Sequence, residues 1–167
     1  MIFVMSGSAS HQFIRLLEVM DEMAPRLGEP VIMQCGRQTY PGRHTECFGY
    51  STFMHVHSLL RECRVLVGQG SAGAVLMSRQ YGKPLVLVPR DHKRGEILDQ
   101  HQLETARSVE GTSRMIEVVT DVAGLEAAVR RAQAKADAGL TYESSSERER
   151  LLTALRAAVE GREMPTP

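Results

Sequence analysis

Residues 85–102 read LVLVPRDHKRGEILDQHQ, and this stretch decides the class of fold. Its first four residues form an uninterrupted apolar run, which is typical of a buried strand in a parallel sheet. A helical pattern follows over residues 98–109. A dense polar segment therefore lies where a strand ends and a helix begins. In open α/β sheets, ligands bind outside the carboxyl ends of the strands.

The polar segment carries side chains that donate and accept hydrogen bonds, as the recognition of a polyhydroxylated ligand such as a sugar requires. These side chains are Glu96, Asp99, Gln100, His101 and Gln102. The same residues are equally compatible with a solvated loop in front of a well-capped helix. Residue types alone leave both interpretations open.

Two further strand–loop–helix units have small residues where the helix begins. In one, the short strand pattern Arg64-Val65-Leu66-Val67 leads into the loop 68–74, and the helix that follows ends at Gly82. In the other, residues 2–5 lead into Ser-Gly-Ser-Ala-Ser at 6–10. Such loops let backbone N–H groups approach a phosphate, and the helix dipole favours its negative charge. Neither loop is a Walker loop or a dinucleotide fingerprint. Together with the polar segment they predict a nucleotide ligand with a sugar attached.

Strand and helix patterns alternate along the chain. We expect strands near residues 2–5, 31–35, 46–49, 64–67, 85–88 and 115–119, and helices near 10–24, 53–62, 72–81, 98–109 and 122–137. This alternation predicts an α/β fold, with a doubly wound, Rossmann-like parallel sheet and helices on both faces. The expected division is a nucleotide-sugar-binding domain over residues 1–137, a linker over 138–146 and an amphipathic helix over 147–161.

The C-terminal helix has two interpretations. Ser146 and Glu149 have the spacing of a capping box at its start. An apolar stripe then runs along one face, formed by Leu151, Leu152, Leu155 and Val159. The stripe can pack on the chain's own domain, or it can dock on a partner subunit.

Composition excludes several classes of function. Twenty Lys and Arg residues balance twenty Asp and Glu residues, so the chain lacks the basic footprint of a nucleic-acid-binding protein. No stretch approaches the roughly 20 apolar residues needed to cross a bilayer. The three cysteines have no zinc-site spacing, and their odd number indicates a reducing compartment. His55 and His57 do not share a helix face, so no metal site is expected there. These features predict a cytoplasmic protein.

The chain resembles the C-terminal-domain family of glycosyltransferase family 28. That family includes the donor-binding subunit of the two-part UDP-GlcNAc transferase of dolichol-linked oligosaccharide synthesis, and two-part bacterial transferases of exopolysaccharide and capsule synthesis. The most specific matching motif is Pro-Arg-x-x-x-x-Gly-Glu-x-x-Asp-x-His-Gln, which starts at Pro89. Other matches are Met1-Ile2-Phe3-Val4 with Gly7, Ser8 and Phe13; Ile32 to Gly36 with Tyr40; and the turn and helix from Gly70 to Pro84.

The resemblance implies a single domain of the GT-B C-terminal type that binds a UDP-sugar and needs no metal. Gly7, Ser8, Ser71, Ala72 and Gly73 would hold the donor diphosphate; Glu96, Asp99, Gln100 and Gln102 would hold the sugar; Phe53 and Met54 would lie in the loop for the base. The sugar would pass to a lipid-linked or glycan acceptor. A membrane-associated acceptor-binding subunit would supply the catalytic base, and would bring this chain to the inner face of the membrane.

Two departures from the family pattern support an alternative function. Gln69 occupies a position where the family usually has His, and Met77 occupies one where it often has an acidic residue that can hold the ribose. A chain that has lost full nucleotide-sugar binding could serve as a non-catalytic, partner-stabilising subunit.

Overall fold

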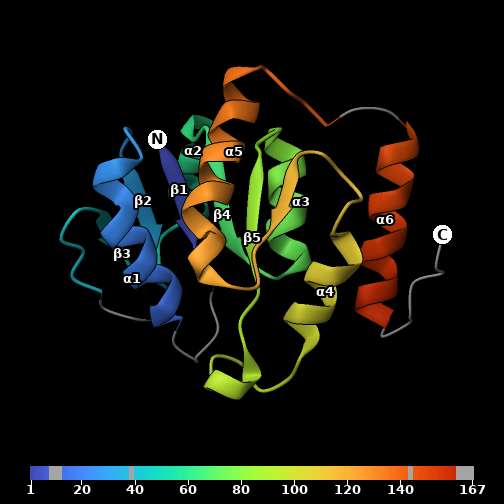
Figure 1. The fold of residues 1–167 in the computed structure, drawn as a ribbon, viewed down its shortest axis with the longest axis horizontal. Coiled ribbons are helices and arrows are strands. Elements are labelled where there is room, and N and C mark those ends of the chain that lie inside the picture. The colour runs from blue at the N-terminus through green and yellow to red at the C-terminus, as the bar shows by residue number, and fades with distance from the viewer. Residues whose placement is uncertain (8–12, 38–39, 143–144, 161–167) are drawn as a thin grey trace.

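The computed structural model describes residues 1–7, 13–37, 40–142 and 145–160. Six parallel strands form one sheet in the order β3-β2-β1-β4-β5-β6 (Figure 1). The strands are β1 Ile2–Met5, β2 Val31–Gln34, β3 Glu46–Phe48, β4 Val65–Gln69, β5 Leu85–Val88 and β6 Ile116–Val118. The strand order reverses between β1 and β4. A crevice is expected at the carboxyl ends of these two strands, and the predicted fold class is confirmed.

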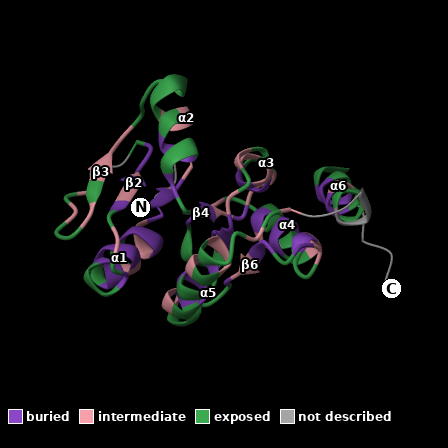
Figure 2. Ribbon diagram, turned by 90° about the horizontal axis from the view of Figure 1, so that it is seen from above, coloured by how far each residue is buried: buried purple, intermediate pink, exposed green. Residues whose placement is uncertain are grey.

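Helices cover both faces of the sheet. The helices are α1 Ile14–Met23, α2 Phe53–Glu62, α3 Ala72–Tyr81, α4 His101–Val109, α5 Leu125–Asp137 and α6 Ser145–Glu160. Three short 3₁₀ helices are η1 Ala24–Arg26, η2 His92–Arg94 and η3 Val122–Gly124. Figure 2 shows α1 and α5 on one face and α2, α3 and α4 on the other.

The two faces of the sheet have separate cores. Ile2 and Val4 of β1 pack with residues of α1 and α5, whereas Phe3 packs with residues of α2, α3 and α4. All four residues of β5 are fully buried. A strand that is covered on both faces needs apolar side chains at every position, which explains the uninterrupted apolar run at 85–88.

Helix α4 begins at His101, three residues later than the predicted start. The intervening chain follows a different local pattern. Gly95 ends η2 in the left-handed conformation, with φ +70°. Asp99 then accepts a hydrogen bond from the backbone N–H of His101 at 3.0 Å. An aspartate that binds the backbone two residues ahead favours a turn over a helix.

Helix α6 packs against α4 of the same chain, and both views place the two helices side by side (Figures 1 and 2). Leu151 and Ala154 are fully buried and Leu155 is nearly so, whereas Val159 is 66% exposed. This packing supports the own-domain alternative for the stripe. Ser146, the first residue of the predicted capping box, has a side chain outside the described part of the structure.

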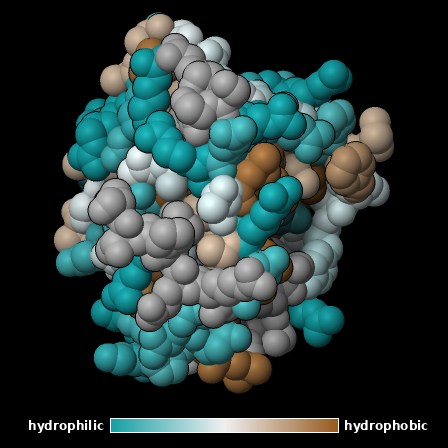
Figure 3. Space-filling model, turned by 90° about the vertical axis from the view of Figure 1, so that its right-hand side faces the viewer, coloured by the Kyte–Doolittle hydropathy of each residue, from teal (hydrophilic) through white to brown (hydrophobic). Residues whose placement is uncertain are grey.

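The side of the molecule that carries α6 is largely hydrophilic. Its hydrophobic areas are small and separated from one another by polar side chains (Figure 3). The visible described surface there offers no continuous apolar face. Within the described ranges, no helix is both long and apolar enough to cross a membrane.

Candidate functional site

The loops that follow β1, β4 and β5 meet at the carboxyl end of the sheet, and two glycines allow their close approach. A Cβ atom on Gly70 would lie 2.6 Å from the carbonyl oxygen of Gln102 and 2.9 Å from Cα of Pro89. Gly7 has φ +90°, and a Cβ atom there would overlap the side chain of Gln69. Larger residues at these positions would separate the loops, so the two glycines allow the loops to pack closely at the base of the crevice.

Arg90 lies at the centre of this junction and is only 2% exposed. Its guanidinium donates to Oε1 of Gln69 at 3.0 Å and to the backbone carbonyls of Glu96 and Ser6, each at 2.8 Å. It also lies over the ring of Phe13, 4.9 Å from the centroid. Burial lowers the pKa of Arg90, and the nearby Glu96 carboxylate opposes this shift. An arginine nevertheless stays protonated in proteins, so the loops are joined around a fixed positive charge.

Glu96 is 6% exposed, and its carboxylate is held by the chain itself. Arg15 of α1 donates to both oxygens, from Nε at 2.9 Å and from Nη2 at 2.8 Å. The backbone N–H of Asp91 donates to Oε2 at 2.9 Å. Bidentate, charge-assisted bonds of this kind are among the strongest in proteins. They fasten α1 to the loop after β5.

Gln102 completes the junction from the first turn of α4. Its Oε1 accepts the backbone N–H of Arg90 at 3.1 Å, and its Nε2 donates to Oε1 of Gln69 at 3.1 Å. We name this set of side chains the Arg90 network. Its members are Arg15, Gln69, Arg90, Glu96 and Gln102. The network joins the loops after β1, β4 and β5 to α1 and α4.

The predicted diphosphate residues lie at the ends of two adjacent strands. Gly7 follows β1, and Ser71 caps α3 after β4 by accepting the N–H of Ala74 at 3.3 Å. Ala72 is half-buried and Gly73 is exposed, so the first turn of α3 is open to solvent. The structure thus brings Gly7 and the start of α3 to one end of the sheet. Ser8 lies outside the described residues.

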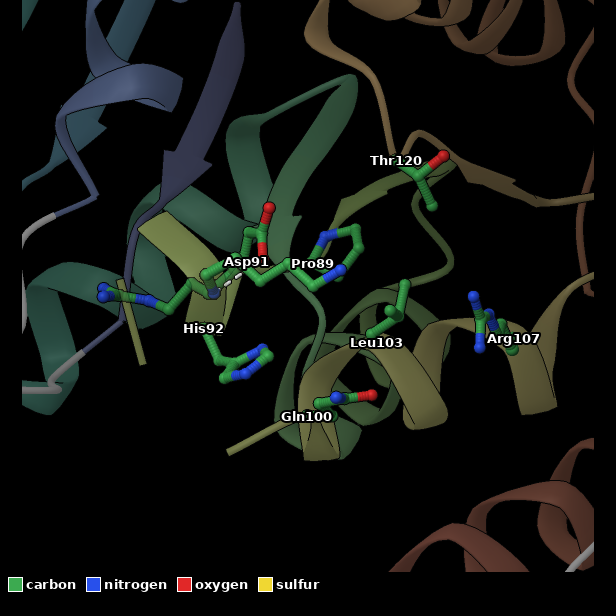
Figure 4. Close-up of a pocket in the computed structure, with 9 residues that line it drawn as sticks. Pro89, Asp91, His92, Gln100, Leu103, Arg107 and Thr120 are labelled. Atoms are coloured by element: carbon green, nitrogen blue, oxygen red, sulfur yellow. Dashed lines mark hydrogen bonds between the residues drawn. The ribbon is translucent and has the colours of Figure 1, made fainter. Parts of the chain in front are cut away.

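The four predicted sugar residues fall in three places. Glu96 and Gln102 belong to the Arg90 network, whereas Asp99 is exposed in the loop before α4. Gln100 lines a separate pocket of about 360 Å³ between the loops after β5 and β6 (Figure 4). The complete lining of this pocket is Pro89, Arg90, Asp91, His92, Lys93, Gln100, Leu103, Arg107 and Thr120.

The predicted base loop is exposed at the start of α2. Phe53 and Met54 each expose 69% of their surface, and the ring of Phe53 stacks on His57 with centroids 5.7 Å apart. A second pocket, of about 530 Å³, lies next to this loop. It is lined by Cys35, Gly36, Arg37, Tyr40, Cys47, Phe48, Gly49 and Tyr50. The second pocket and the adjoining start of α2 therefore both carry aromatic side chains.

Cys35 and Cys63 are poor candidates for nucleophiles. Burial, together with the neighbouring thiol of Cys47, raises the pKa of Cys35 to about 12, and burial raises the pKa of Cys63 to about 11. Only a thiolate is a good nucleophile, and both groups are neutral thiols at physiological pH. Among the described residues, no cluster of three or more His, Cys, Asp or Glu side chains is placed to hold a metal ion.

Sequence reasoning missed Arg15 and the central role of Arg90. Arg15 is the only basic residue of α1, on a helix that otherwise buries its apolar face, and this was an available signal. The structure buries Arg90, and its guanidinium donates to groups of the chain itself.

A family model described as the glycosyltransferase family 28 C-terminal domain matches residues 1–158. No curated protein sequence matches the chain. Among solved structures, the kitacinnamycin glycosyltransferase has a TM-score of 0.59 at 21% identity, covering 95% of this chain and 42% of that one. SnogD from Streptomyces nogalater has a TM-score of 0.55 at 17% identity, with 96% and 39% covered. This chain thus spans about two fifths of those two proteins. The solution structure of ALG13 has a TM-score of 0.56 at 17% identity, with 87% and 89% covered.

Proposed function

The chain belongs to the glycosyltransferase family 28 C-terminal domain family, and on that premise we propose that it is the donor-binding part of a two-part GT-B-type glycosyltransferase. It would move a sugar from a UDP-sugar to a lipid-linked or glycan acceptor. The observation that carries this proposal is the junction of three loops at the reversal point of the sheet, held by the Arg90 network beside the open N-terminus of α3.

The junction suits a diphosphate. Backbone N–H groups of the first turn of α3, beginning at Ala72 and Gly73, are available to an anion, and the helix dipole favours it there. Gly7 and Ser8 would hold it from the β1 side. The Arg90 network carries two guanidinium groups against one carboxylate, so one net positive charge lies at this end of the sheet. Fixed donors and charge of this kind stabilise the negative charge that develops on a departing diphosphate without a metal ion.

Sugar recognition would combine direct and supporting residues. Asp99 is exposed, and among the described residues its carboxylate is bonded only through Oδ1, to the N–H of His101. Its second oxygen can accept a bond from a sugar hydroxyl. Glu96 and Gln102 would bind the sugar from within the Arg90 network, since each side chain still has capacity for a further hydrogen bond. Phe53 and Met54 would cover the base.

The acceptor would bind to a second unit. We propose a membrane-associated acceptor-binding subunit that supplies the general base for the acceptor hydroxyl. The match to ALG13 over 89% of that chain supports a subunit of this size. The donor-binding subunit would then work in the cytoplasm, at the membrane only through its partner.

The position of Gln69 favours a second candidate function. Its side chain lies against Gly7, in the crevice proposed for the diphosphate, and is bonded to Arg90 and Gln102. If it does not move aside, the crevice cannot take the donor. The chain would then be a non-catalytic subunit that stabilises its partner.

Titration of UDP into the chain, with and without a chelator, tests the donor site. We expect binding that a chelator leaves unchanged, since helix N–H groups and arginine charge replace a metal in this crevice. Isothermal calorimetry measures the affinity. A strict requirement for a divalent metal would contradict the proposed site, and no heat at millimolar UDP would favour the non-catalytic alternative.

Substitution of Met77 tests the ribose position. Met77 is half-buried against the core on the α3 face, so Met77→Glu should cost about 1–3 kcal/mol of unfolding free energy by desolvating a carboxylate. Leu76→Glu is the matched control, because Leu76 is 47% exposed on the same helix. Thermal denaturation compares the two. Tighter UDP binding by Met77→Glu at unchanged stability would contradict this expectation and place residue 77 at the ribose.

A further inference from the structure

The pocket between the loops after β5 and β6 shares only Arg90 with the Arg90 network of the proposed donor site. The Arg90 network links the loop after β5 to β1 and β4, and this pocket lies on the other side of the same loop, toward β6. Gln100 and Gln102 show the separation. Gln102 donates a hydrogen bond to Gln69 of β4, whereas Gln100 lines the pocket together with Thr120, which follows β6.

The lining of the pocket combines apolar, polar and basic groups. Helix α4 contributes Leu103 and Arg107, and its N-cap residue is Gln100; the three are spaced at i, i+3 and i+7 and therefore lie along one side of the helix (Figure 4). Pro89 and Leu103 give an apolar surface, while the amide of Gln100 and the hydroxyl of Thr120 can exchange hydrogen bonds. A pocket of about 360 Å³ is within the range of small-molecule sites.

Three of the four basic side chains that line the pocket have no partner among the described residues, whereas Arg90 is bonded within its network. Within the described residues, the side chains of His92, Lys93 and Arg107 make no hydrogen bond or ion pair. The one carboxylate in the lining, Asp91, is already occupied. It accepts the backbone N–H of Lys93 at 2.9 Å and pairs with Arg94 at 3.5 Å. The hollow therefore has an excess of cationic donors, and these favour an oxyanion.

We propose that this pocket binds a phosphorylated sugar, with the phosphate between Lys93, Arg107 and His92, and the sugar against Pro89 and Leu103. Gln100 and Thr120 would contact its hydroxyls. The pocket thereby gives Gln100 a ligand separate from the donor sugar. The site itself does not depend on the UDP crevice. Only its interpretation as the place of the acceptor's phosphate depends on the proposed function.

Calorimetric titration with glucose 1-phosphate tests the site, with glucose and inorganic phosphate as partial probes. We expect glucose 1-phosphate to bind more tightly than either. The double variant Lys93→Ala with Arg107→Ala should weaken its binding at least tenfold, because a hydrogen bond to a charged group is worth about 1.5–3 kcal/mol. Arg61→Ala is the matched control, since Arg61 is an exposed arginine on α2 whose side chain has no partner within the described residues.

UDP binding by the double variant separates the two proposals. We expect it to stay within about twofold of the unchanged chain. Equal loss of UDP and glucose 1-phosphate would make the pocket part of the donor site and overturn the inference. So would an equal effect of Arg61→Ala, or no binding of glucose 1-phosphate at millimolar concentrations. Binding of glucose 1-phosphate without any binding of UDP would retain this site and reject the donor site.

The source of the ligand is decided by a second probe, a short-chain alkyl diphosphate ester of glucose. Tighter binding than that of glucose 1-phosphate would assign the pocket to a lipid-linked acceptor. Equal binding would assign it to a soluble sugar phosphate. Both results support a phosphorylated sugar, and failure of both probes to bind would reject it.

Discussion

Arg90→Met should lower the free energy of unfolding by about 3–5 kcal/mol. The buried guanidinium donates to the backbone carbonyls of Ser6 and Glu96, and a methionine would deprive both carbonyls of the donor that they have among the described residues. Each buried group left unpaired costs about 1–3 kcal/mol, and the contact with Phe13 would change as well. In a domain of this size the loss corresponds to a fall in melting temperature of roughly 10 °C. Differential scanning calorimetry measures it directly.

Two further variants make the Arg90 result specific. Arg61→Met removes an exposed arginine and should change stability by less than about 0.5 kcal/mol. Arg90→Lys keeps the charge but loses the planar fork of donors, so it should be almost as destabilising as Arg90→Met. If Arg90→Met were as mild as Arg61→Met, Arg90 would not join the loops, and its guanidinium would be available to a ligand.

Most of the fold could be predicted because its strands follow local patterns. The run at 85–88 is apolar at every position since both faces of β5 are covered, and α3 ends at Gly82, which adopts the left-handed conformation with φ +64°. The start of α4 was predicted wrongly. Apolar spacing extended the helix to residue 98, whereas Gly95 and the backbone bond of Asp99 delay it to His101. Turn chemistry prevailed over periodicity there.

The candidate site could be predicted only in part. The polar segment identified Glu96 and Gln102 from residue type, yet what each one binds depends on contacts that span the chain. Arg15 and Glu96 are 81 positions apart, and Arg90 and Ser6 are 84 apart. No local pattern reports such a pair. Gln100 and Gln102 lie in different sites for the same reason. The strands on either side of the loop determine which residues each side chain contacts, and these strands are distant in sequence.

The apolar stripe of the C-terminal helix shows the same limit in another form. A period of 3.6 residues indicates that Leu151, Leu155 and Val159 share a face, but not which surface covers them. The structure divides the stripe, burying Leu151 and Leu155 near α4 and exposing Val159. Residues that are equivalent in the sequence pattern are therefore expected to contribute differently to the free energy of unfolding, and this difference can be measured.

Leu151→Ala should lower the free energy of unfolding by about 2–5 kcal/mol, the usual cost of emptying a fully buried leucine site. Val159→Ala, on the same face eight residues later and 66% exposed, should cost less than about 0.5 kcal/mol. Urea denaturation of both variants gives the comparison.

A docking helix that is free of its own domain would behave otherwise, since both substitutions would then leave the stability of the isolated chain unchanged. Equal and small effects would reject the packing of α6 on α4 and restore the partner-docking interpretation. A large effect of Leu151→Ala alone would make α6 part of the donor-binding domain, and a partner would then have to be sought on another surface.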